Sequence, residues 1–310
     1  MTTKKRLVGN ILLGIVFLFA FLCFIFRVKG AYTVKVYQPG ELVSPFKDED
    51  FDISLMRLNT MAKLEAYCDS LFETNRSNRT YPGLVAEVIR KKFFHGYSSY
   101  DENNNAIGYY LSVVTKKGLA AIVIPDDIVK YPNAACSQQS IVGMELFKKK
   151  SYPVRKITMW DTVYKAGHFA YEVFYDKDWH FFDTNQEPDG EILKKYNRPS
   201  VAFLAAHPDI VAAAYHKRDQ AFFQRLIMSS KVGPVNKFPA PYAYIFQKST
   251  KFLTHFGWAF VWILILVYNR QLTGQYISRL FFLLRIKKKK KQLTPYPVAH
   301  LHEQKQKACV

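Results

Sequence analysis

Asn133-Ala-Ala-Cys136-Ser-Gln-Gln-Ser140 begins the stretch of sequence that decides the fold. It leads into a helical pattern that ends at Lys148-Lys-Lys150, and a strand pattern follows over residues 154–159. Two more strand patterns come next, in Gly167-His168-Phe-Ala-Tyr-Glu-Val-Phe174 and in Trp179-His-Phe-Phe-Asp183-Thr-Asn185. The sequence therefore predicts that a cysteine begins a helix, a histidine begins a strand and an aspartate ends the next strand.

The last two segments flank the polar turn Tyr175-Asp-Lys-Asp178, a pattern typical of a β-hairpin. If Asp176-Lys177 form a two-residue turn, His168 lies opposite Asn185. Asp183 is then on the same face of the sheet as His168, because side chains alternate along a strand. Such diagonal neighbours lie roughly 7–8 Å apart at the backbone, within reach of an imidazole and a carboxylate. A three-residue turn would instead place the two side chains on opposite faces.

A cysteine in the first turn of a helix is suited to nucleophilic chemistry. The unpaired backbone N–H groups and the helix dipole favour a thiolate at Cys136, and the same groups can hold the oxyanion of a tetrahedral intermediate. His168 would take the thiol proton and later protonate the leaving group. Asp183 would orient the imidazole and stabilise its protonated form. We therefore expect Cys136, His168 and Asp183 to be the catalytic residues.

The order of these residues resembles the core of the transglutaminase-like superfamily, which shares a Cys-His-Asp triad with papain-like enzymes. His168 follows Cys136 by 32 residues, and Asp183 follows His168 by 15. Glu172 and Trp179 also fall where the pattern of that superfamily places them. The resemblance implies an α+β fold in which a helix bearing the cysteine packs on an antiparallel sheet bearing the histidine and the aspartate.

The same resemblance implies acyl transfer through a thioester, with a peptide or protein as substrate and without a cofactor or a metal ion. Hydrolysis of a peptide or amide bond in the cell envelope, by a protease or amidase, is the favoured expectation. A transamidase that links the acyl group to an amine is an alternative. A third possibility is a non-catalytic binding or scaffold domain on the same fold.

The same cysteines and histidines are also compatible with a metal site, a disulfide or structural roles. A zinc site built from Cys136, His168 and His180 is disfavoured, because no fourth ligand lies close by in the sequence. A disulfide between Cys68 and Cys136 in an oxidising compartment would remove the nucleophile. His180 points to the opposite face of its strand from Asp183, so we expect a structural or surface role for it. For Glu172, on the same face as His168, a structural hydrogen bond is expected.

The charge of the chain is strongly positive, at +19 from 44 basic and 25 acidic residues. From Arg270 to the end there are ten Lys or Arg residues and one acid, Glu303, which indicates a basic tail on an anionic surface. Nucleic acid is not an expected partner, because the sequence has no zinc-finger spacing, RNA-binding aromatic motif or recognition-helix pattern. The 49% hydrophobic content predicts a packed core.

Two apolar runs are candidates for membrane-spanning helices. The first, residues 7–26, carries no charge and follows a basic start; a cleaved signal peptide is the alternative to an uncleaved anchor. The second, residues 252–268, is shorter, and a buried core helix is its alternative. The dense basic cluster after residue 270, including Lys287 to Lys291, marks that end as cytoplasmic by the positive-inside rule. With two spans both termini are cytoplasmic, and the domain between them is extracytoplasmic.

The remaining segments carry further secondary-structure patterns, and together with the apolar runs they divide the chain into five parts. Helices are expected over 83–94 and 209–228, and strands over 109–114 and 119–124. Residues 271–286 could form an amphipathic helix on the inner leaflet, next to the lysine run. The predicted parts are the basic N-terminal segment and anchor (1–30), the transglutaminase-like domain (31–231), a linker (232–251), the second transmembrane helix (252–269) and the basic tail (270–310).

Overall fold

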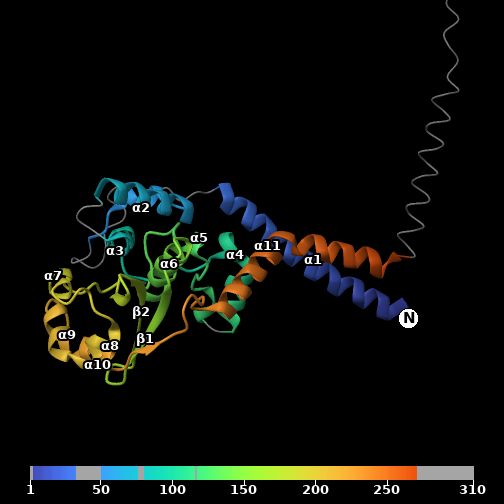
Figure 1. Cartoon of the computed structure of the whole chain (residues 1–310). Coiled ribbons are helices and arrows are strands. Elements are labelled where there is room, and N and C mark those ends of the chain that lie inside the picture. The colour runs from blue at the N-terminus through green and yellow to red at the C-terminus, as the bar shows by residue number, and fades with distance from the viewer. Residues whose placement is uncertain (1–2, 33–49, 76–79, 116, 271–310) are drawn as a thin grey trace, which may run out of the picture. The chain divides into compact units, whose positions relative to one another are not determined.

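The computed structural model describes residues 3–32, 50–75, 80–115 and 117–270 (Figure 1). The chain divides into two compact units, one of residues 21–256 and one that combines residues 1–20 with 257–310. The predicted amphipathic segment 271–286 and the lysine run after it lie outside the described residues.

The larger unit is built on a four-stranded sheet with the strand order β3-β2-β1-β4. Every neighbouring pair of strands is antiparallel. The strands are β1 (Val154–Asp161), β2 (Ala166–Tyr175), β3 (Asp178–Phe182) and β4 (Lys231–Val232). The expectation of a mixed α and β domain with an antiparallel sheet is therefore confirmed.

Helices cover both faces of this sheet (Figure 1). Side chains that alternate along the strands supply two separate apolar cores, as period-two alternation requires. Tyr171 and Phe182 pack with one set of helices, and Ala170 and Phe181 pack with the other. The first set is α2 (Met61–Asn75), α3 (Tyr81–Lys92) and α6 (Cys136–Lys149). The second set is α7 (Gly190–Lys194), α8 (Val201–Ala206), α9 (Pro208–Ala214) and α10 (Gln220–Met228).

The β2–β3 hairpin has the predicted two-residue turn. Asp176 and Lys177 both have positive φ, at 47° and 70°, which is the backbone conformation of a type I′ turn. The ladder pairs Tyr175 with Asp178 and continues to Tyr171 opposite Phe182. The register is therefore the one that places His168 and Asp183 on one face.

The predicted strand over 109–114 is wrong, because these residues form the second half of helix α4 (Glu102–Val114). Asp101 caps this helix by accepting hydrogen bonds from the N–H groups of Asn103 and Asn104, both at 2.9 Å. A kink at Asn105 (φ −156°, ψ 72°) separates the first turn from the rest. The apolar and aromatic run has strand propensity, but tertiary contacts around α4 outweigh it.

The second predicted strand, over 119–124, is also wrong. It begins in the short 3₁₀ helix η2 (Lys117–Ala120) and continues as extended chain with one bridge, between Ala121 and Ser99. Another 3₁₀ helix, η1 (Ile53–Arg57), and the single turn α5 (Pro125–Ile128) complete this side of the unit. The predicted helix over 83–94 is confirmed as α3.

The single helix predicted over 209–228 is two helices, α9 and α10. The turn at Tyr215 to Arg218 ends the first helix, and Asp219 starts the second by accepting a hydrogen bond from Phe222 N–H at 3.0 Å. An Asp cap inside an apolar helical pattern is the local signal for this break.

Among the residues that the structure describes, two helices are long and apolar enough to cross a membrane: α1 (Thr3–Tyr32) and α11 (Pro241–Tyr268). The apolar stretch of α1 covers residues Arg6–Gly30 with a mean hydropathy of 2.8, and that of α11 has a mean hydropathy of 1.6. Helix α11 begins at Pro241, inside the segment predicted as a linker. Its first half, up to Phe256, belongs to the larger unit.

In the smaller unit, the described parts of α1 and α11 contact each other. Asn10 and Asn269 form a reciprocal amide pair, with N···O distances of 3.3 and 2.8 Å. A Cβ atom at Gly9 would lie 2.4 Å from the hydroxyl of Tyr268, so the tyrosine side chain occupies the space that glycine leaves.

Candidate active site

Cys136 is the first residue of α6, and the loop before it is held on both sides. Phe94 N–H donates to Pro132 O, and Ala134 N–H donates to Phe94 O, each at 3.0 Å. From the helix side, Gln139 Nε2 donates to Ala134 O at 3.0 Å. The backbone that carries Cys136 is thus fixed, and its thiol is half-buried and not part of a disulfide.

Gln138 anchors the start of α6 more firmly than any residue singled out from the sequence. Its Oε1 accepts hydrogen bonds from Ala135 N–H at 3.1 Å and from Ser98 N–H at 3.0 Å. Its Nε2 donates to Ser98 O and Ile122 O, both at 2.8 Å. The side chain is buried and makes all four of these bonds, so it joins the helix to two other segments of the chain.

Helix α6 packs closely on β2, the strand that carries His168. Ser140 Oγ donates to Phe169 O at 3.3 Å. A Cβ atom at Gly143 would lie 2.9 Å from the ring of Tyr171, so glycine at this position permits the close approach. The helix that bears the cysteine therefore rests beside the start of the strand that bears the histidine.

His168 and Asp183 are in direct contact, with 2.7 Å between Nε2 and Oδ2. Asp183 lies one residue beyond the last paired residue of β3, Phe182. The imidazole is nearly buried, and the ring of Phe223 from α10 meets it edge-on at 6.2 Å between centroids. The hairpin register predicted from the sequence places these two residues as expected.

Asp183 is fully buried and is surrounded by hydrogen-bond donors. Its Oδ2 accepts from the hydroxyl of Tyr215 at 3.1 Å as well as contacting His168. Its Oδ1 accepts from Gln186 N–H at 3.0 Å. The ring of Tyr215 stacks on Phe223 with 4.0 Å between centroids, which fixes the hydroxyl in place. These donors favour the ionised carboxylate.

The electrostatics of the pair favour opposite charges on the two residues. Burial lowers the pKa of His168, but the charge and hydrogen bond of Asp183, followed by a hydrogen bond with Cys136, raise this pKa to about 10. Burial also raises the pKa of Asp183, but the charge and hydrogen bond of His168 hold it below its usual range. Cys136 therefore lies near enough to the imidazole of His168 to affect its pKa. Since Nε2 faces Asp183, Nδ1 is the nitrogen available to Cys136.

Glu172 has the structural role that was expected. Its Oε2 pairs with Arg155 Nε at 2.6 Å, and its Oε1 accepts from Val201 N–H at 2.6 Å. The guanidinium of Arg155 also lies 3.9 Å from the ring centroid of Trp179. Glu172 thereby ties β2 to β1 and to the start of α8.

His180 and Cys68 both lie away from this site. The two ring nitrogens of His180 contact backbone carbonyls, including Tyr175 O at 3.0 Å and Arg198 O at 2.8 Å. Cys68 is a free thiol in the apolar core, so it forms no disulfide with Cys136. Burial, with the nearby charges of Asp69 and Glu65, raises the pKa of Cys68 to about 12.

Sequence reasoning missed three residues of this site: Gln138, Tyr215 and Phe223. Gln138 carries a signal, because Gln at the third position of a helix is half of a capping box. Tyr215 and Phe223 carry none, since they come from the part of the chain predicted as one continuous helix. Only the packing of α9 and α10 on the sheet brings them to Asp183.

A cavity of about 790 Å³ borders the site, and its lining includes Gln139, Thr184 and Tyr215. Ion pairs form part of its wall: Arg90 with Asp50 at 2.6 Å, and Arg198 with Glu187. Burial raises the pKa of Glu187. Cys136, His168 and Asp183 do not line this cavity, so it borders the site through Tyr215, whose hydroxyl donates to Asp183.

Comparisons with known proteins add little to this geometry. No family model matches the chain, and no curated protein matches it. One solved structure, described as "Crystal structure of a TGase", is 15% identical over 51% of this chain, with a TM-score of 0.24. The match spans about a third of that chain (36%).

Proposed function

We propose that this chain is a membrane-anchored enzyme with a cysteine nucleophile, which transfers an acyl group through a thioester. Its proposed reaction is the hydrolysis of a peptide or amide bond in the cell envelope. The observation that carries the proposal is the 2.7 Å contact between His168 Nε2 and Asp183 Oδ2, in a pair whose imidazole also has its pKa raised by Cys136. The position of Cys136 at the start of α6 supports the same role.

The proposed mechanism uses only side chains and backbone groups of this site. The proton of the Cys136 thiol passes to Nδ1 of His168, and the thiolate attacks the carbonyl carbon of the substrate. First-turn N–H groups of α6, including that of Cys136, hold the oxyanion. His168 then returns its proton to the leaving amine as the C–N bond breaks, which leaves a thioester. A water molecule, deprotonated by His168, attacks the thioester and releases the acid and the free thiol.

Anchoring and orientation are part of the proposal. The two long apolar helices support a double anchor. The basic residues before α1 and after α11 favour a cytoplasmic location for both termini, which leaves the domain outside. Transfer of the acyl group to an amine instead of water, and a binding domain without catalysis, are the alternatives.

The first test is the rate at which iodoacetamide labels Cys136 in the detergent-solubilised full chain, from about pH 5 to about pH 9. We expect fast labelling at neutral pH, slowed strongly by His168→Ala, because the imidazole holds the thiol proton. Cys68 is an internal control, since its raised pKa keeps it protonated over this range. If the labelling rate of Cys136 rises only near the ordinary thiol pKa of about 8.5 and is unchanged in His168→Ala, the non-catalytic alternative is supported.

With a substrate found by peptide and amide screening, Cys136→Ala and His168→Ala should each lower activity more than about a thousandfold.

Asp183→Asn should cost less activity, because an amide oxygen still accepts from His168. With the amide oxygen toward His168 and Tyr215, the NH₂ group would face Gln186 N–H, which is also a donor, so that hydrogen bond is lost. Incorporation of a labelled amine into the product, in place of simple release of the acid, would identify a transamidase. Full activity in Cys136→Ala would overturn the mechanism.

A further inference from the structure

Helix α4 has an inverted distribution of polar and apolar side chains. Its buried face carries Asn105, Gly108 and Ser112, with 0% exposure at Asn105 and 4% at Ser112. Its exposed face carries large apolar residues, including Val113 at 65% and Val114 at 82% exposure. With Tyr110 and Leu111, also exposed, these residues cover a single face of the helix. A helix facing water has the opposite arrangement.

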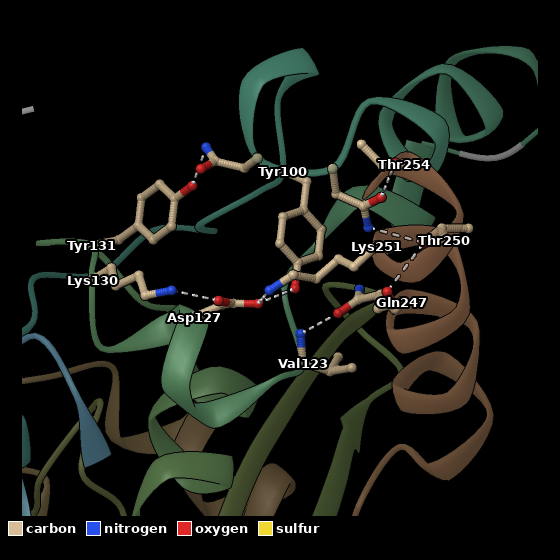
Figure 2. Close-up of polar contacts among 11 residues, drawn as sticks. Tyr100, Val123, Asp127, Lys130, Tyr131, Gln247, Thr250, Lys251 and Thr254 are labelled. Atoms are coloured by element: carbon tan, nitrogen blue, oxygen red, sulfur yellow. Dashed lines mark hydrogen bonds and ion pairs between the residues drawn. The ribbon is translucent and has the colours of Figure 1, made fainter. Parts of the chain in front are cut away.

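The buried polar face of α4 is held by α11 through hydrogen bonds. Asn105 Nδ2 donates to Thr250 Oγ1 at 2.9 Å, and Thr254 Oγ1 donates to Asn105 Oδ1 at 3.3 Å. The backbone N–H of Ile107 donates to Thr254 Oγ1 at 3.2 Å. Thr250 and Thr254 lie one turn apart on α11, as Figure 2 shows. The kink at Asn105 allows its side chain to reach both of them.

The same turns of α11 are bound to the rest of the domain. Gln247 Oε1 accepts from Val123 N–H at 2.9 Å, and its Nε2 donates to Ala121 O at 2.7 Å. Lys251 forms an ion pair with the buried carboxylate of Asp127 (Figure 2). Gln247, Thr250, Lys251 and Thr254 recur at helical spacing and form one polar stripe, the α11 seam. The seam fixes α4 and α11 in one orientation within the larger unit.

The end of α1 also meets α4 in this unit. A Cβ atom at Gly30 would lie 2.6 Å from Cβ of Asn103, so the two helices approach closely at that point. On α11, exposed apolar residues flank the seam, with Ile245 at 62%, Phe252 at 50% and Phe256 at 46% exposure. The turns of α11 that bind α4 therefore also carry exposed apolar side chains.

We propose that the exposed apolar face of α4, formed by Tyr110, Leu111, Val113 and Val114, is a membrane-docking surface that lies in the lipid interface. The lipid is favoured over a protein partner because α4 is hydrogen-bonded to α11, a described helix suited to cross a bilayer, at turns of α11 that also carry exposed apolar side chains. Helices that lie in the interface bury such a face at the headgroup boundary. Tyr109 and Tyr110 suit that level, where amphipathic rings gather.

Docking of α4 would hold the domain close to the bilayer and in a fixed orientation. The substrate of the site would then be reached near the membrane surface rather than far from it. This consequence depends on the proposed anchoring by α11, and it is independent of the chemistry at Cys136.

Spin labelling of the full chain in phosphatidylcholine–phosphatidylglycerol vesicles tests the docking. A nitroxide is attached at Val114→Cys in a background in which Cys136 and Cys309 are replaced; Cys23 and Cys68 are buried. The matched control is Val163→Cys, another exposed valine (63%), in the turn between β1 and β2. A third label at Leu264→Cys reports whether α11 is in the bilayer.

The label at residue 114 should collide several-fold more often with molecular oxygen than with a water-soluble nickel chelate, because molecular oxygen is more concentrated in lipid than in water. The label at residue 163 should show the reverse preference. If residue 264 is in lipid but residue 114 behaves like residue 163, α11 spans and α4 does not dock, so the proposal fails. A label at residue 114 shielded from both reagents would indicate a protein partner, such as a second copy, and would also overturn it. If the label at residue 264 is accessible to the nickel chelate, α11 does not lie in the bilayer, and the docking proposal is overturned with the anchoring on which it rests.

Discussion

Tyr215 donates to the same carboxylate oxygen that contacts His168, which makes it a positioning residue for the proposed reaction. Burial raises the pKa of Asp183, whereas His168, then Gln186 N–H and then the hydrogen bond from Tyr215 hold it below the usual range. The ring of Tyr215 is fixed by stacking on Phe223. Removing the hydroxyl alone therefore weakens the support of Asp183 without removing the packing.

Tyr215→Phe should lower kcat by about fivefold to tenfold and change KM little, since the net value of such a bond is about 1 kcal/mol. The acid limb of the pH–rate profile should move to higher pH, because the pKa of Asp183 rises when a donor is lost. Measuring the profile separates this role from a structural one. A lower melting temperature with an unchanged profile would contradict it.

The His168–Asp183 pair also predicts how stability depends on pH. The pKa of His168 is raised from 6.5 to about 10, so the charged ring stabilises the folded state fully below about pH 6.5. This contribution is lost as the pH rises toward 10. The pKa of Asp183 is lowered, so its contribution is lost only as the pH falls below the usual value of 3.8.

Denaturation midpoints of the wild type should therefore decline across the window from pH 6.5 to 10, and those of His168→Gln should decline less. Urea titrations at a series of pH values measure the difference. Parallel curves for the two proteins in this window would show that the imidazole is not held in its charged form.

Helix α6 and strand β2 depend on one close contact for their spacing. A methyl group added at Gly143 would lie 2.9 Å from the ring atoms Cζ and Oη of the buried Tyr171. Tyr171 packs in turn on Phe147 and Phe182, with ring centroids 5.6 and 5.8 Å away. Displacement of the ring would disturb the apolar core between the helix and the sheet.

Gly143→Ala should cost about 1–3 kcal/mol of stability by overpacking and should slow the labelling of Cys136, because α6 must shift. The matched control is Gly190→Ala at the start of α7, where nothing lies within 4 Å of the added methyl group. The control should be neutral or slightly stabilising. Equal urea midpoints for the two variants would mean that the ring of Tyr171 moves aside without cost.

At the scale of the whole molecule, α11 contributes residues to both units, as α1 does. Gln247 of the α11 seam satisfies two backbone groups, Val123 N–H and Ala121 O, in the segment that leads to α5. The first half of α11 is therefore bound to the larger unit by side-chain hydrogen bonds. The domain loses backbone hydrogen bonds if this half is altered.

Gln247→Ala should destabilise the larger unit by about 1–3 kcal/mol, because two partly buried backbone groups lose their partner. Ser249→Ala, at an exposed position on the same helix, should change stability by less than about 0.5 kcal/mol. Amide exchange in detergent should show faster exchange of Val123 N–H in the first variant only. Equal exchange in both variants would argue that α11 is not bound to the domain through this residue.

Much of the site follows from the sequence because it depends on local rules. A two-residue turn at Asp176 and Lys177 fixes both the register of the hairpin and the face on which each side chain lies. The contact between His168 and Asp183 follows from that register alone. The start of α6 at Cys136 is likewise a local feature, marked by the helical pattern after it.

The tertiary structure decided the features that join distant segments. Whether the apolar run over 109–114 forms a strand or a helix depends on the surface it meets, since a short apolar run is compatible with both. It forms the second half of α4 because Asn105 and Ile107 bind α11, whose threonines lie more than a hundred residues away. Tyr215 reaches Asp183 only because α9 and α10 pack on the sheet. Local periodicity specifies turns, faces and helix starts, whereas contacts between distant segments depend on packing that no local pattern encodes.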